Sequence, residues 1–237
     1  MAGKGKYYES QFEEATIELL RESHWQYTFG DDIHRKYTDP LIEEDLRTFL
    51  AAQYKDKKLT ASEMDGIVAN LRNTGGQNDY YAQQNTFLLY RDGYDFTYSD
   101  GRDNPFRLQY IDFEHPDHNI FRCVNQFVME QGRENRRPDI LLFVNGIPVC
   151  IVELKNPTKQ NATIRDAHTQ ICTRYMRDIP ALLKYCALAV ISDGAKNELG
   201  TTYTPFEFFY EWKKIDNEDK AGKGLDTLRT LVRGALS

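Results

Sequence analysis

The chain of 237 residues lacks any long apolar segment. It contains no run of about eighteen apolar residues, and its opening, MAGKGKYYES, has no apolar core of the kind that a secretory signal requires. These absences exclude a transmembrane helix and favour a cytoplasmic protein without membrane contacts. Because 41% of the residues are hydrophobic, a sizeable core can form, and we expect one compact domain with extensions over residues 1–237.

Cysteine is scarce too. The four cysteines are Cys123, Cys150, Cys172 and Cys186. Three of them lie in apolar or helical stretches, which favours small buried thiols over disulfides or zinc ligands. The one close pair of histidines, His115 and His118, lies in a segment with proline and aspartate and has no partner pair. A solvated loop is therefore the favoured interpretation there.

The chain also lacks an excess of basic residues. A formal net charge of -6 does not favour a protein that coats DNA by bulk attraction, because such binding requires Lys and Arg to neutralise phosphates. The charge is uneven, however. From Arg122 to Arg177 the chain has nine basic and five acidic residues, or about +4, which leaves about -10 elsewhere. Both a local anion site and a plain solvated surface are compatible with this pattern.

Helical periodicity dominates the first third of the chain. Apolar residues at helical spacing predict a helix over residues 7–23. Asp39 and Pro40 are typical of an N-cap and a first-turn proline, and Thr60 with Glu63 matches a capping box. We therefore expect a helical N-terminal part over about residues 1–75, with a loop over residues 73–84.

Strand patterns follow. Residues 87–90 and 94–98 flank Asp92-Gly93, which predicts a hairpin, and residues 106–113 and 121–129 are rich in β-formers. The runs 140–144 and 149–152 are almost wholly apolar and surround Asn145-Gly146. This pattern predicts a hairpin buried on both faces, in the middle of a sheet.

Helices return in the last third, with one more strand between them. We expect a helix over residues 163–177, a buried strand over 185–191, a helix from Thr204-Pro205 to Trp212, and a C-terminal helix over about 222–236. The order predicts an α/β (α+β) fold, with a central mixed β-sheet flanked by helices and a core over about residues 85–215.

Three ionisable residues stand at the ends of the buried hairpin. Asp139 follows Pro138 at its entrance, and Glu153 and Lys155 follow its second strand. Because side chains alternate along a strand, Glu153 and Lys155 share a face. Charged groups beside otherwise apolar strands require a reason, since their burial is costly.

Whether Asp139 joins them depends on the register of the hairpin. With Asn145-Gly146 as a two-residue turn, strict pairing places Asp139 opposite Val152 and on the wrong face for Glu153. A one-residue bulge corrects this. Pro148 cannot donate a ladder hydrogen bond, so we predict a bulge at or near Ile147 and Pro148.

With the bulge, two carboxylates and a lysine converge. Carboxylate oxygens suit Mg²⁺, which keeps several waters and binds through one or two carboxylates together with phosphate oxygens. Asp139 and Glu153 are therefore the candidate metal ligands, and Lys155 is the candidate for orienting an attacking water and offsetting phosphate charge. The competing interpretation is a surface Glu-Lys pair that finishes a structural hairpin, because Glu-x-Lys is common.

With these residues the chain resembles the PD-(D/E)XK nuclease superfamily, since Pro138-Asp139 and Glu153-Leu154-Lys155 match its motif in order and spacing. The string NQFVMEQGRENRRPDILLFVNGIPVCIVELKNPT, residues 125–158, is similar to the N-terminal nuclease region of the restriction subunit of type I restriction-modification enzymes. Residues 177–180 and 190–194 extend the resemblance, and Phe12-Glu13 fits its opening helix.

The resemblance implies a restriction-endonuclease-like core that cleaves double-stranded DNA with Mg²⁺ in the prokaryotic cytoplasm. It further implies partnership with modification and specificity subunits and with an ATP-driven motor in the same polypeptide. This chain has no G-x-x-x-x-G-K-[ST] phosphate loop, so we expect no motor domains and no ATP hydrolysis within it.

The family also suggests accessory residues. Its members carry a Gln and a Tyr, usually four residues apart, on the helix after the Glu-x-Lys strand. The candidates here, Gln170 and Tyr175, are five apart and would point about 140° away from each other in a regular α-helix. Either a π-bulge restores their geometry or one of them has lost the role. Glu13 is a further candidate, in competition with Glu14 and Glu18.

Basic residues near the motif are candidate DNA contacts. These residues are Arg136, Arg137, Lys159 and Arg174. Two alternatives to the restriction nuclease stand beside it: another PD-(D/E)XK enzyme, such as a repair nuclease or resolvase, and a non-catalytic DNA-binding or assembly module. The second is disfavoured because two carboxylates would repel a phosphate that is only bound.

Overall fold

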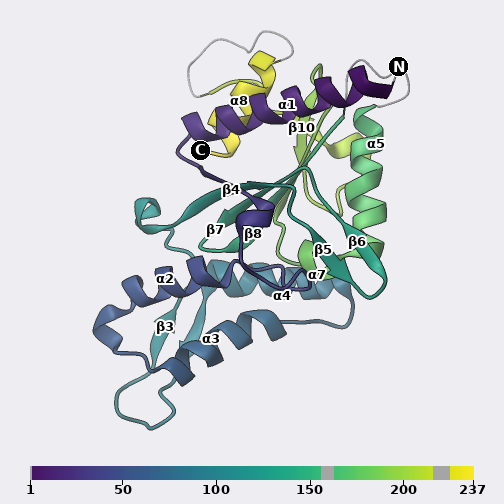
Figure 1. Ribbon diagram of the computed structural model, residues 1–237. Helices are drawn as coiled ribbons and strands as arrows, with labels where there is room; N and C mark the ends of the chain where they lie inside the picture. Colours follow the sequence, from purple (N-terminus) through teal and green to yellow (C-terminus); the bar gives the residue numbers. More distant parts are fainter. Residues whose placement is uncertain (1, 156–162, 216–224) are drawn as a thin grey trace.

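A mixed sheet of seven strands forms the centre of the protein, whose computed structural model describes residues 2–155, 163–215 and 225–237 (Figure 1). In sheet order the strands are β1 (Gln26–Phe29), β4 (Phe121–Asn125), β7 (Ile140–Val144), β8 (Ile147–Leu154), β9 (Leu188–Ser192), β10 (Asn197–Gly200) and β11 (Tyr210–Glu211). β1 is parallel to β4 and β8 is parallel to β9, whereas the other neighbours are antiparallel. The prediction of a central mixed sheet is confirmed.

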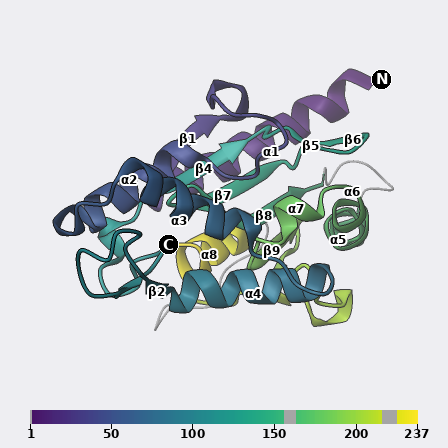
Figure 2. The same cartoon turned by 90° about the horizontal axis from the view of Figure 1, so that it is seen from below.

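Helices surround this sheet. They are α1 (Ala2–Glu22), α2 (Glu43–Gln53), α3 (Ala61–Asn73), α4 (Asp79–Asp92), α5 (Ile164–Thr169), α6 (Met176–Asp178), α7 (Pro180–Leu183) and α8 (Leu225–Ala235). Figure 1 shows α1 beside α8, with α2, α3 and α4 grouped below the sheet, and Figure 2 shows α2 and α5 on opposite sides of the molecule. In the described part of the chain, no helix combines the length and the apolar character needed to cross a bilayer.

Two short ladders lie outside the main sheet. One pairs β2 (Tyr94–Phe96) with β3 (Phe106–Leu108), and the other pairs β5 (Met129–Gln131) with β6 (Glu134–Arg136). Short 3-10 turns occur at η1 (Gly30–Asp32), η2 (Lys55–Lys57), η3 (Pro116–His118) and η5 (Phe206–Phe208). The β5–β6 ladder leads directly to Pro138-Asp139 and so delivers the first motif residue to the sheet.

The two faces of the sheet belong to two hydrophobic clusters. Leu142 of β7 packs in the cluster that contains Leu20 of α1 and Leu228 of α8. Its neighbour Leu141 packs in the other cluster, with Ile171. Alternating residues of one strand thus enter different layers, which explains why β7 is apolar throughout. The prediction of a hairpin buried on both faces is confirmed.

The predicted bulge is present in the β7–β8 hairpin. Val144 pairs with Ile147 and Phe143 with Pro148, but Leu142 then pairs with Cys150, so Val149 is the extra residue. The irregularity lies directly beside Pro148, which supplies no N–H to the ladder. It shifts every later pair by one residue, and Ile140 consequently lies opposite Val152.

The hairpin turn is fixed by its own sequence. Asn145 and Gly146 both have positive φ angles, 50° and 75°, as a type I′ turn requires. A Cβ atom at Gly146 would lie 2.1 Å from the carbonyl oxygen of Ile42, which donates its own N–H to the Gly146 carbonyl oxygen. Glycine is therefore required here both by the backbone conformation and by the close approach of the segment before α2.

The hairpin predicted around Asp92-Gly93 is wrong. Residues 79–92 form helix α4, and Gly93, with φ of 69°, caps its C-terminus. Asp-Gly suits a type I′ turn and a helix end equally well, because both need a residue with positive φ. The loop predicted over residues 73–84 is wrong in its second half for the same reason, since α4 begins there.

The helix predicted from Thr204-Pro205 to Trp212 is also wrong. The chain forms one 3-10 turn, η5, and then enters the edge strand β11. Asp39 likewise does not cap a helix: its Oδ1 accepts the N–H of Leu41 in a local turn, and α2 begins only at Glu43. The capping box of Thr60 and Glu63 at the start of α3 is confirmed.

Candidate active site

The hairpin brings the three motif residues together. Since Ile140 pairs with Val152, the preceding Asp139 lies level with Glu153 and on the same side of the sheet. Asp139 Oδ2 accepts the backbone N–H of Leu154 at 2.7 Å. Lys155 Nζ donates to Glu153 Oε1 at 2.6 Å, and its backbone N–H donates to the carbonyl oxygen of Ser192 on β9 at 2.7 Å.

A π-helical turn supplies two further side chains. Between α5 and α6 the chain forms a π-helix, η4 (Gln170–Tyr175). Its i→i+5 bonding brings residues five apart onto one face, which a regular α-helix would not do. Gln170 Oε1 accepts from Lys155 Nζ at 2.8 Å, and Gln170 Nε2 donates to Tyr175 Oη at 2.7 Å. Of the two alternatives that the spacing left open, the structure has the π-helical one, in which both side chains lie on one face.

Tyr175 closes the ring of hydrogen bonds. Its buried hydroxyl donates to Glu153 Oε2 at 3.3 Å. Both oxygens of Glu153 thus have a donor, one from Lys155 and one from Tyr175, and Gln170 links the two donors. The sequence alternative of a solvated surface pair does not fit, because only 1% of the Glu153 side chain is exposed.

The carboxylate of Glu153 lies in an environment that disfavours its charged form. Burial, and secondarily the nearby charge of Asp139, raise the pKa of Glu153 to about 8, although the bonds from Lys155 and Tyr175 oppose this shift. Burial and the charge of Glu153 also raise the pKa of Tyr175, so its hydroxyl stays a donor. Two neighbouring carboxylates beside Lys155 fit a divalent cation, which would relieve their repulsion. Each carboxylate offers about four lone pairs, so a hydrogen bond on an oxygen still leaves room for a metal.

Glu13 of α1 is connected to this site through the side chains of two amide residues. It accepts from Asn125 Nδ2 at 2.7 Å and from Gln126 Nε2 at 3.1 Å. Gln126, with φ of 56°, donates its backbone N–H to the carbonyl oxygen of Asp139. The sequence analysis missed Asn125 and Gln126. The available signal was a pair of polar amides directly after a buried strand.

The predicted basic residues occupy different situations. Arg136 donates to Asp178 at 2.7 Å and also to Glu134, so its charge is already paired. Arg137 and Arg174 are exposed, the first directly before Pro138-Asp139 and the second beside Tyr175 on the π-helix. Lys159 lies outside the described residues.

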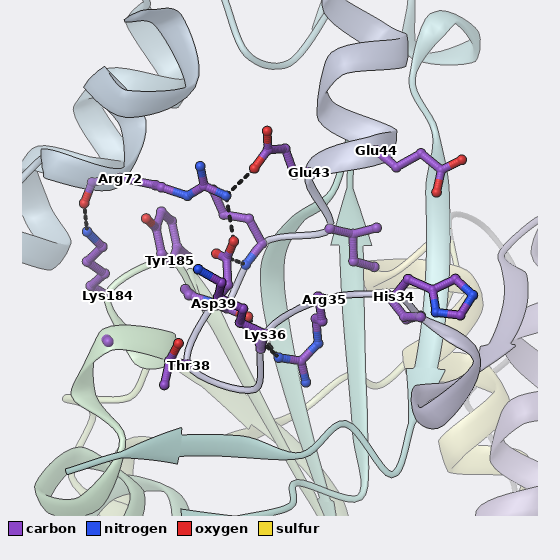
Figure 3. Close-up of a pocket in the computed structure, with 15 residues that line it drawn as sticks. His34, Arg35, Lys36, Thr38, Asp39, Glu43, Glu44, Arg72, Lys184 and Tyr185 are labelled. Carbon is purple, nitrogen blue, oxygen red and sulfur yellow. Dashed lines mark hydrogen bonds and ion pairs between the residues drawn. The ribbon is translucent and has the colours of Figure 1, made fainter. Parts of the chain in front are cut away.

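A separate pocket lies between the segment 33–44, α3 and the residues after α7 (Figure 3). It has a volume of about 590 Å³, and none of the three motif residues is among its described lining residues. Arg72 bonds to both Asp39 and Glu43, and Lys184 Nζ donates to the carbonyl oxygen of Arg72 at 2.7 Å. These contacts tie α3 to the segment before α2 and to the residues after α7.

A mixed sheet whose central hairpin carries Pro-Asp at its entrance and Glu-x-Lys at its exit has the fold and motif of restriction-endonuclease-like nucleases. Sequence comparison narrows this class. The family model described as "Type I restriction enzyme R protein N terminus" matches residues 6–208. The chain therefore belongs to this family of N-terminal nuclease domains.

Curated relatives have consistent names. The chain is 29% identical to the type I restriction enzyme HindI endonuclease subunit of Haemophilus influenzae over 96% of its own length and 22% of that subunit. It is 39% identical to the putative type I restriction enzyme MjaIXP endonuclease subunit of Methanocaldococcus jannaschii over 47% of its length and 11% of the relative. For the EcoprrI endonuclease subunit of Escherichia coli the identity is 32%, over 52% of this chain and 40% of the relative. The chain thus spans about a fifth of the HindI subunit.

Proposed function

We propose that this chain is a single nuclease domain that cleaves double-stranded DNA with Mg²⁺ as part of a type I restriction enzyme. The observation that carries the proposal is the β-bulge at Val149, which places Asp139 and Glu153 on one side of the sheet beside Lys155. Family membership supports the restriction role. The roles of the residues are inferred from the geometry, whereas cleavage of double-stranded DNA with Mg²⁺ is what the resemblance to the family implies.

Asp139 and Glu153 would hold the metal, which when bound supplies a water of lowered pKa and stabilises charge on the phosphate. The Leu154 N–H bond fixes Asp139, and the Tyr175 hydroxyl fixes Glu153. Once a cation shares Glu153, the ammonium of Lys155 is available to orient the attacking water and to offset the charge that develops on the phosphate. Gln170 then keeps Lys155 directed at the site.

DNA contacts are proposed for the exposed cations that flank the motif. Arg137 and Arg174 are the described residues that suit phosphate binding, because both are exposed near the site. We propose Lys159, which follows the Glu-x-Lys motif in the sequence, as a third contact. Arg136 is better suited to holding β6 against α6, since Asp178 and Glu134 already pair its charge.

The relatives' names suggest the larger assembly. Each is called an endonuclease subunit of a type I restriction enzyme, and this chain spans 22%, 11% and 40% of them. We propose that modification and specificity subunits and an ATP-driven motor deliver DNA to the site in the prokaryotic cytoplasm. ATP hydrolysis is not proposed for residues 1–237, which have no phosphate loop.

Calorimetry with Mg²⁺ or Mn²⁺ on the wild type, Asp139→Ala and Glu153→Ala tests the site, together with plasmid cleavage by the complete restriction complex carrying the same changes. We expect both variants to lose metal binding and cleavage while circular dichroism shows an intact fold. Glu198→Ala, which removes a half-buried glutamate of β10 in the same sheet, is the matched control and should keep both activities. Unchanged cleavage in the Asp139 or Glu153 variant would overturn the proposal.

A further inference from the structure

A second cluster of metal-ligating side chains lies at the other end of the sheet. The segment before β4 carries Asp112, His115 and His118, whose candidate ligand atoms all lie within 4.8 Å of one another. This segment enters β4 at Phe121, whereas Asn125, at the far end of β4, pairs with Ile140 next to Asp139. The length of β4 therefore separates the cluster from the proposed nuclease site.

We propose that Asp112, His115 and His118 bind a zinc-type transition-metal ion. Asp112 Oδ2 lies 3.0 Å from His118 Nδ1 and 3.7 Å from His115 Nδ1. In a tetrahedral zinc site with bonds of about 2.1 Å, neighbouring ligand atoms are about 3.4 Å apart. The two observed separations lie on either side of that value, and all three candidate ligand atoms lie within 4.8 Å of one another.

The two imidazoles lie close together beside one carboxylate, but their rings must rotate before both can ligate one ion. Their rings are stacked, with centroids 5.0 Å apart and planes 17° from parallel, and both Nδ1 atoms face the same carboxylate. The histidine side chains are 61% and 51% exposed, which gives an ion access and leaves the fourth position to water. Zinc accepts three protein ligands with water in the fourth position, and such a site should bind more weakly than a structural site closed by four protein ligands.

Asp112 is held in place for this role. Only 6% of its side chain is exposed, and its Oδ1 accepts the backbone N–H groups of Glu114 at 3.1 Å and His115 at 2.9 Å. Gln53 of α2 donates to Oδ2 at 3.2 Å. Hydrogen bonds to a ligating carboxylate orient it and are typical of a prepared metal site.

The chemistry of the three candidate ligands indicates which kind of ion would bind. Two imidazoles and one carboxylate suit zinc, whereas Mg²⁺ prefers oxygen ligands alone. The cluster and the Asp139–Glu153 pair therefore differ in both chemistry and position. The sequence alone did not show this, because Asp112 fell within a predicted strand over residues 106–113, which left the two histidines without a third ligand.

The position indicates a structural use. Asp112 donates its N–H to Asn119 Oδ1, which also accepts from Asn145 Nδ2 in the hairpin turn. Gln53 joins the same carboxylate from α2. A bound ion would thus fasten the helical N-terminal part to the turn end of the central hairpin, and it would stabilise the fold without taking part in DNA cleavage.

Calorimetry with zinc chloride tests the proposal. The protein carries Asp139→Ala throughout, so that zinc held by the nuclease carboxylates is not counted. We expect one equivalent of zinc to bind and to raise Tm by about 5 °C. His115→Ala and His118→Ala should each abolish both effects while leaving Tm in a chelator unchanged, because both side chains are exposed. His34→Ala, an exposed histidine before α2, is the matched control and should behave like the parent.

Asp112→Asn separates the ligand from the loop support. The amide oxygen can still accept the backbone N–H groups of Glu114 and His115, so the loop should stay folded, but zinc should bind at least about tenfold more weakly. Zinc binding and a Tm rise that persist in the His115 and His118 variants would overturn the proposal. So would the absence of zinc binding to the parent protein at micromolar concentrations.

Discussion

The two ends of the β7–β8 hairpin bury polar groups in opposite ways. At the turn, Asn145 is fully buried and completely satisfied: its Oδ1 accepts from Ile120, and its Nδ2 donates to Tyr110 and Asn119. At the open end, Glu153 is equally buried but lies beside a second carboxylate, which contributes to its raised pKa. Satisfied burial stabilises a fold, whereas burial of like charges costs stability and persists where a ligand requires it.

The largest effect should come from neutralising the open end. Glu153→Gln removes the buried charge and retains the shape, so DNA cleavage by the complete restriction complex should fall by about 10³-fold or more. The free energy of unfolding, measured with urea in metal-free buffer near pH 8, should not fall, because the repulsion with Asp139 disappears. A variant that is inactive and also clearly less stable would show that Glu153 mainly supports the fold.

The turn end should respond in the opposite sense. Asn145→Ala leaves the N–H of Ile120 and the carbonyl of Tyr110 without their partner, so the free energy of unfolding should fall by about 4 kcal/mol. The fraction that remains folded should cleave DNA normally within the complex. Asn135→Ala, which removes an exposed side chain, is the control and should change the stability little. An Asn145 variant of normal stability would contradict the claim that the polar group buried at the turn stabilises the fold.

The pH dependence of the free energy of unfolding should also distinguish the open end of the hairpin from the turn. Because the pKa of Glu153 rises from 4.5 in the unfolded chain to about 8 in the fold, the folded state binds the extra proton between these values. The wild type should therefore lose about 4 kcal/mol relative to Glu153→Gln as the pH increases from 4.5 to 8, and the change should level off about one pH unit above the folded pKa. Urea titrations of both proteins in a chelator measure this difference. A constant difference would mean that Glu153 is charged throughout.

The smallest effect is expected in the π-helix. Tyr175→Phe removes the hydroxyl that links Gln170 to Glu153, and cleavage by the complex should fall by about tenfold, because the supporting hydrogen bond is lost and the metal ligands remain. Tyr90→Phe is the matched control, since Tyr90 is also buried and bonds to a carbonyl far from the motif. Equal activities of the two variants would assign Tyr175 a packing role only.

Sequence reasoning succeeded where one local rule governs each feature. Asn-Gly determines the turn, and the need to bring Asp139 and Glu153 to one face predicted a bulge, which the structure has beside Pro148. It failed at α4, where the buried residues Gln83, Thr86 and Tyr90 weaken the apolar periodicity of the helix. The polar groups of Gln83 and Tyr90 are satisfied by distant parts of the chain, namely the carbonyls of residues 183 and 186 for Gln83 and that of Tyr185 for Tyr90. Such long-range contacts leave no local signal.

The accessory residues mark the boundary of what the sequence can predict. Spacing alone left two possibilities for Gln170 and Tyr175, and only the backbone of η4 decides between them. The position of Glu13 was open for a similar reason, because its partners Asn125 and Gln126 lie more than a hundred residues away. Residues joined through tertiary contacts require coordinates.

The bulge at Val149 also imposes a parity rule on the evolution of this hairpin. Thirteen residues lie between Asp139 and Glu153, an odd number that places both on one face only because one residue is extra. A relative with the same two-residue turn and an even number between its two carboxylates should have a regular ladder. Insertions and deletions of a single residue in these strands are therefore tolerated only when a bulge is gained or lost with them.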